Sequence, residues 1–109
     1  MSRDAQLYIA DVVAAGEAIL RYTDDVTFQV FAANDEKRAA VERQRFIIGE
    51  GAARLPDEWK RRLPEVPWRK IVGLRNLLAH GCWTIDAEEL WDVARNKVPE
   101  FLAALRPLL

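Results

Sequence analysis

The chain has little of several residue types that mark common protein classes. Its 109 residues include one cysteine, one methionine, five glycines and five prolines. One cysteine excludes an internal disulfide framework, and so few glycines and prolines leave no room for a low-complexity linker. The apolar runs are only a few residues long, too short to cross a bilayer. We therefore expect one domain over residues 1–109 that does not enter a membrane.

The chain also lacks an excess of charge and an apolar leader. Sixteen basic and seventeen acidic side chains give a net charge of −1, which argues against a protein that coats nucleic acid. The chain begins Met-Ser-Arg-Asp, without the apolar core of a secretory signal. Together with the single cysteine, this start predicts a cytoplasmic protein.

Positive charge is nevertheless concentrated in one region. Between Arg54 and Arg75 there are seven basic residues and three acidic ones. A run of this kind is typical either of a solvated helical face or of a patch that attracts phosphate groups. Composition alone leaves both interpretations open.

The apolar pattern predicts an all-α protein. No segment alternates apolar and polar residues for long, and no Asn-Gly or Asp-Gly pair indicates a hairpin. Apolar residues recur at helical spacing in four long segments. Four such helices with short connections predict an up-and-down four-helix bundle with one extra short helix. The long segments cover about residues 2–22, 35–54 and 67–79 and the region after 86, and the short helix covers 57–62.

Several residues predict where these helices begin, end or bend. Ser2 and Thr27 are suited to cap helix starts, and Asp86 with Glu89 resembles a capping box. Gly81 is placed to end a helix, and Pro99 is expected to kink the last one. Small residues at 49, 51, 52 and 53 predict a close helix contact, either within the bundle or between subunits.

The segment Arg75–Asp86 holds the only histidine and the only cysteine of the chain. Arg75 offers a planar fork that can hold two phosphate oxygens. His80 titrates near neutral pH and can transfer a proton. Asn76 lies four residues before His80, on the same face of a helix, where it could orient the imidazole or donate to a phosphate. This set is suited to cleaving a phosphodiester.

A structural interpretation of the same residues is also open. A lone arginine can pair with a buried acid, and a lone histidine can satisfy the last carbonyls of its helix. Cleavage by a 2′-hydroxyl would use both a base and an acid, whereas one chain offers one histidine. We therefore predict a homodimer in which two copies of the segment form one composite site.

The whole chain resembles HepT-type proteins of the HEPN superfamily. The residues that carry the resemblance lie in six blocks: Ile47–Glu50, Arg54–Pro56, Pro67–Asn76, His80–Gly81, Ile85–Asp86 and Leu90–Trp91. The family motif is an arginine, four residues, a histidine, any residue and a tyrosine. Arg75 and His80 match it, and Asn76 matches the polar residue that commonly follows the arginine. The resemblance implies a HEPN-like helical bundle that acts as a ribonuclease toxin, with an MntA-like nucleotidyltransferase as its antitoxin.

The chain departs from the family at Cys82, which stands where the family has the tyrosine that the antitoxin modifies with AMP. A thiol is a poor substitute acceptor, so control through this position is in doubt. Cys82 can instead be a small packing residue beside Trp83, and Trp83 either stacks on a base or packs in an interface. Arg69 and Lys70 are the other candidates for contacts with RNA. Glu50 is explained by an ion pair with Arg54.

Two functional hypotheses follow. The first is a metal-independent endoribonuclease toxin, without a cofactor, that uses Arg75, Asn76 and His80 on RNA, with tRNA as a candidate substrate. The second is a non-catalytic HEPN scaffold that binds the partner nucleotidyltransferase or a nucleotide. One histidine and one cysteine two residues apart cannot complete a metal site within one chain, so we expect no metal.

Overall fold

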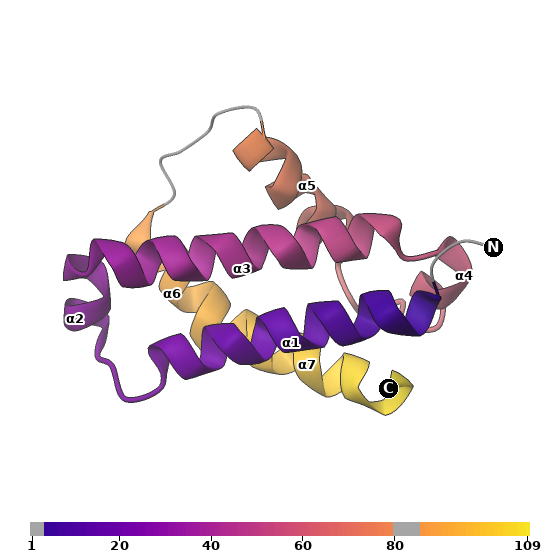
Figure 1. The fold of residues 1–109 in the computed structure, drawn as a ribbon, viewed down its shortest axis with the longest axis horizontal. Coiled ribbons are helices and arrows are strands. Elements are labelled where there is room, and N and C mark those ends of the chain that lie inside the picture. The colour runs from indigo at the N-terminus through magenta and orange to yellow at the C-terminus, as the bar shows by residue number, and fades with distance from the viewer. Residues whose placement is uncertain (1–3, 80–85) are drawn as a thin grey trace.

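The computed structural model describes residues 4–79 and 86–109, and in 74–79 it describes the backbone alone. Across these ranges the chain is helical and contains no strand, which confirms the all-α prediction. Figure 1 shows the arrangement. The elements are α1 (Ala5–Thr23), α2 (Phe28–Ala33), α3 (Asp35–Arg54), α4 (Asp57–Lys60), α5 (Trp68–Ala79), α6 (Ala87–Asp92), the π-helical turn η1 (Val93–Lys97), α7 (Val98–Leu105) and the short 3₁₀ turn η2 (Arg106–Leu108).

Side-chain caps fix most of the helix starts. Asp4 caps α1 by accepting a hydrogen bond from the Gln6 N–H at 3.0 Å. The prediction of Ser2 as this cap is wrong for the helix as it stands, because α1 begins at Ala5; Ser2 itself lies outside the described residues. Thr27 caps α2 as predicted, accepting from Val30 at 3.2 Å. Asn34 caps α3 in the same way.

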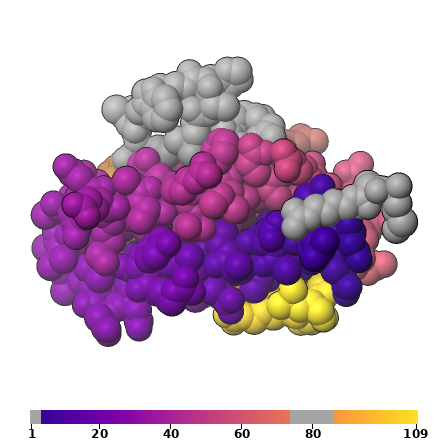
Figure 2. All heavy atoms as spheres, viewed as in Figure 1, coloured from indigo at the N-terminus to yellow at the C-terminus, as the bar shows by residue number. Residues whose placement is uncertain are grey.

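The helices α1 and α3 run antiparallel and side by side, and they pack together along their length (Figure 1). In the space-filling view these two helices make most of the visible face, with α7 at its edge (Figure 2). Behind them, α7 packs on α1 and α5 packs on α3. The core is formed by buried apolar side chains from α1, α2, α3, α6 and α7: Ile9, Val12, Val13, Ile19, Phe31, Val41, Ile48, Leu90, Val98, Phe101, Leu102 and Leu105.

Two glycines lie where helices approach closely. A Cβ added to Gly16 of α1 would lie 2.8 Å from Cδ2 of Leu102 in α7. Gly51 of α3 faces Val12 of α1. Of the two roles predicted for the small residues of α3, Gly51 therefore fills the one within the chain.

The C-terminal helix is irregular just before Pro99. The Val98 N–H donates to the Val93 carbonyl, five residues back, which is the π-helical pattern. Proline has no N–H, and its ring displaces the carbonyl four residues earlier. The bend expected at Pro99 thus takes the form of a wider turn on its N-terminal side.

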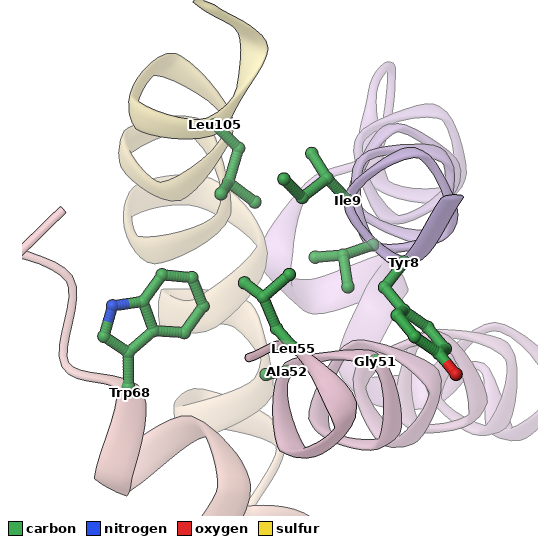
Figure 3. A pocket seen from close by; sticks show the side chains of 8 residues that line it. Tyr8, Ile9, Gly51, Ala52, Leu55, Trp68 and Leu105 are labelled. Carbon is green, nitrogen blue, oxygen red and sulfur yellow. The ribbon is translucent and has the colours of Figure 1, made fainter. Parts of the chain in front are cut away.

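The connection from α3 to α5 is held by Trp68. Its Nε1 donates to the Leu63 carbonyl at 3.1 Å, and its ring packs edge-on against Phe101 at 5.9 Å. Trp68 and Leu105 close a small apolar recess against α1 and the end of α3 (Figure 3). The recess has no room for a water-sized molecule, so it is packing rather than a ligand pocket. The short helix α4 ends at Lys60, two residues before the predicted end at 62.

None of the helices in 4–79 and 86–109 is both long and apolar enough to cross a bilayer.

Candidate functional site

Helix α5 carries the first half of the predicted site. Trp68 anchors its N-terminal end, and the helix packs against α3. Arg75 and Asn76 lie on its last two turns, and His80 follows directly after its last residue, Ala79. The side chains of Arg75 and Asn76 lie outside the described part of the structure, as do His80, Cys82 and Trp83 and the predicted helix stop at Gly81. Their mutual geometry stays a prediction.

Arg69 and Lys70 stand on the first turn of α5, and both side chains are exposed. Arg61 and Arg62 of the preceding corner are exposed as well. The Arg62 guanidinium lies over the half-buried Trp59 ring, with Cζ 4.3 Å from the ring centre. This stack is a cation–π contact that holds one positive group in place beside its mobile neighbours. The corner therefore presents cations to solvent ahead of the predicted site, as either interpretation of the basic run requires.

Glu50 has the partner that its spacing predicts. Its Oε2 lies 3.8 Å from Nη2 of Arg54, one helical turn later. Both side chains reach solvent, so the pair adds only a few tenths of a kcal/mol to stability.

Arg45 of α3 is a polar residue that the sequence pattern missed. Its side chain is only 4% exposed. Its nearest carboxylate in the described residues belongs to Glu89 of α6, with Oε1 3.7 Å from Nη1. Burial lowers the pKa of the Arg45 guanidinium, while the carboxylates of Glu89 and Glu42 raise it.

A positional signal for Arg45 was present in the sequence. It lies four residues after Val41 and three before Ile48, on the buried stripe of α3. An arginine on such a stripe must either be satisfied by partners or serve a function.

Helix α6 begins on the other side of the motif segment. Asp86 caps it by accepting from the Glu88 N–H at 3.1 Å, as the cap prediction required. Glu89, the second residue of the predicted capping box, extends toward Arg45. The end of α5 and the start of α6 thus bracket the segment that contains His80, and both helices contact α3.

The described residues offer no other centre for chemistry. They contain no group of three or more His, Cys, Asp or Glu side chains able to hold a metal ion. A second hollow, at the corner between α2 and α3, is open to solvent and is lined by Val30, Ala33, Asn34, Asp35 and Glu36.

Comparisons with known proteins place the chain. The model of the family described as "Ribonuclease HepT-like" matches residues 14–108. A protein of Methanocaldococcus jannaschii with the name "Putative RNase" is 33% identical over 98 residues, which are 90% of each chain. A "Probable ribonuclease HepT" of Thermococcus cleftensis is 32% identical over 99 residues, 91% of this chain and 90% of its own. No solved structure matches the chain significantly. The family match and these relatives show that the chain belongs to the ribonuclease HepT-like family.

Proposed function

We propose that this protein is a metal-independent endoribonuclease, built as a single HEPN-like bundle over residues 1–109. The observation that carries the proposal is the placement of Arg75 and Asn76 on the last turns of α5, with His80 next after the helix ends. The names of its relatives support the same activity, because they are ribonuclease names.

Each residue of the motif has a role in this reaction. Arg75 holds and neutralises the scissile phosphate, which gains charge as the transition state forms. His80 transfers a proton, since its imidazole exists in both forms near pH 7. Asn76 orients the imidazole or donates to a phosphate oxygen. The 2′-oxygen attacks phosphorus and the bond to the 5′-oxygen breaks, which leaves a cyclic phosphate and a free 5′-hydroxyl.

The reaction needs one group to remove the 2′-hydroxyl proton and another to protonate the leaving oxygen. One chain supplies a single histidine. We therefore propose a homodimer in which the motif segments of two copies face one RNA strand.

Contacts with the flanking RNA are assigned to Arg69, Lys70 and Trp83. Arg69 and Lys70 are exposed on the same helix that carries Arg75. Because α5 rises about 1.5 Å per residue, its two ends lie a few nucleotides apart. A strand that extends from the cleavage position along α5 would meet both cations.

The biological setting proposed is that of a cytoplasmic toxin, held in check by an MntA-like nucleotidyltransferase. Control by attachment of AMP would have to differ here, because Cys82 occupies the position of the modified tyrosine. The same departure favours the second candidate function, a non-catalytic scaffold that binds that enzyme or a nucleotide.

The two functions are separated by incubating the purified protein with total RNA in EDTA beside His80→Ala and Arg75→Ala. Arg54→Ala is the matched control, because it removes an exposed cation that lies on α3. Defined fragments from the parent and the control, but from neither motif variant, support the nuclease. Intact RNA in all four reactions, with folding preserved, rejects it in favour of the scaffold.

A further inference from the structure

Arg45 is the buried charge that the proposed mechanism does not use. Its side chain is 4% exposed, and neither Nε nor Nη1 has a hydrogen-bond partner among the described residues. Glu89 lies 3.7 Å from Nη1, beyond hydrogen-bond distance. The guanidinium is therefore close to one carboxylate without being satisfied by it.

Such a group is unusual in a folded protein. Buried polar atoms almost always have hydrogen-bond partners, and an exception calls for a function, a bound ion or a water. A guanidinium carries five N–H donors and is matched in shape to an oxyanion. Arg45 thus has unused donors of the kind that bind phosphate.

The position of Glu89 gives an anion a way in. Glu89 is 55% exposed, so its carboxylate can turn into solvent without a large change in hydration. An incoming anion could then replace it at Nη1, while the rest of Arg45 stays packed in the α3 stripe.

The surrounding elements connect this group to the predicted site. Glu89 lies in the first turn of α6, three residues after the Asp86 cap. The segment with His80 joins the end of α5 to that cap, and both helices contact α3. We propose that Arg45 binds a phosphate oxyanion at the junction of α3 and α6 by displacing Glu89. This assignment deepens the proposed function, since the phosphate would be one of the RNA backbone.

The first test measures the melting temperature of the full chain with inorganic phosphate, against sodium chloride of equal ionic strength. Ligands that bind the folded state raise its stability with concentration. At about ten times the dissociation constant, the parent should melt about 5 °C or more higher. Arg45→Met should lose this shift. Arg43→Met should keep it, because Arg43 is an exposed cation on the same helix.

Glu89→Gln gives a prediction of opposite sign. Without the competing carboxylate, phosphate should bind several-fold more tightly than to the parent. An ion pair that only joins α3 to α6 would give the reverse pattern: a lower melting temperature and no gain in phosphate affinity.

A 2′-O-methyl RNA 12-mer, which cannot be cleaved by 2′-hydroxyl attack, separates free phosphate from RNA as the source. If the Arg45-dependent shift appears with the 12-mer alone, the group reads the RNA backbone. If it also appears with inorganic phosphate, a free oxyanion is sufficient.

The proposal is overturned if phosphate and the 12-mer stabilise the parent and Arg45→Met equally, or stabilise neither. Arg45→Met should remain folded, because apolar replacements of buried charges are commonly tolerated. These measurements need no catalysis, so they keep their meaning if the cleavage assay with His80→Ala shows no activity.

Discussion

Gly51 of α3 and Val12 of α1 are in such close contact that a methyl group at position 51 would lie 2.5 Å from Val12 Cγ2. Real Cβ atoms do not tolerate that distance, so α1 and α3 reach their observed separation only because residue 51 is glycine. Since α3 supports both α5 and α6, the same contact fixes the base beneath the candidate site.

Gly51→Ala should therefore destabilise the protein, although alanine favours helices over glycine. Overpacking of this kind costs typically about 1–3 kcal/mol, because the Val12 side chain or the helix axis must shift. Urea unfolding of the parent and the variant measures the loss. Unchanged or higher stability would show that the α1–α3 contact relaxes freely.

Gly73→Ala is the matched substitution on α5 and should act in the opposite direction. A Cβ at Gly73 would meet nothing within 4 Å. The gain in helix propensity, about 0.5–1 kcal/mol, then has no packing penalty to offset it. The same urea titration should show a higher midpoint, and a lower one would indicate that this face of α5 is covered in solution.

Arg45→Met should leave the stability unchanged or raise it, in buffer without phosphate. Burial lowers the pKa of Arg45, so the folded state binds this proton less tightly than the unfolded state does. The resulting loss of stability is complete below the folded pKa and disappears only as the pH rises through it. It is therefore fully present near neutral pH.

Apolar replacement of buried ionic groups is often neutral or stabilising by about 1–4 kcal/mol. Thermal unfolding at pH 6 and pH 8 should give the same change at both, because both lie far below the range in which arginine titrates. A clear loss of stability would mean that Arg45 has better partners in solution than Glu89.

Arg69→Ala and Lys70→Ala should weaken RNA binding equally for all sequences, since they would contact phosphates and not bases. Each lost phosphate contact should reduce the slope of log affinity against log salt by about 0.7 for a single strand. Fluorescence anisotropy with an uncleavable oligonucleotide at several salt concentrations measures this slope. An unchanged slope would return the basic run to a solvated face.

The sequence predicted the fold well where helix periodicity and capping agreed. The range 35–54 and the Thr27 cap are confirmed. The start of α1 was misplaced because Ser2 and Asp4 are both good caps, and local pattern does not rank them. The π-helical turn could not be derived, because proline predicts a disruption without predicting which carbonyls are reassigned.

The site was predicted only as far as the motif reaches. Arg75, Asn76 and His80 came from spacing and resemblance. Arg45 was overlooked because a charged residue on an apolar stripe is ordinarily read as an error in the stripe. Its burial depends on α6, a distant segment whose Glu89 reaches it only in the folded chain.

The π-helical turn also sets the rotational phase of the C-terminal segment. Leu90, Ala94 and Val98 are buried at intervals of four residues, which a regular α-helix would carry about 40° further around its axis at each step. The wider turn absorbs this drift. Removing one residue from 93–97 would restore ordinary hydrogen bonding but rotate everything after it by about 100°. Leu102 and Leu105 would then leave the α1 surface, so this part of the chain should accept substitutions far more readily than changes in length.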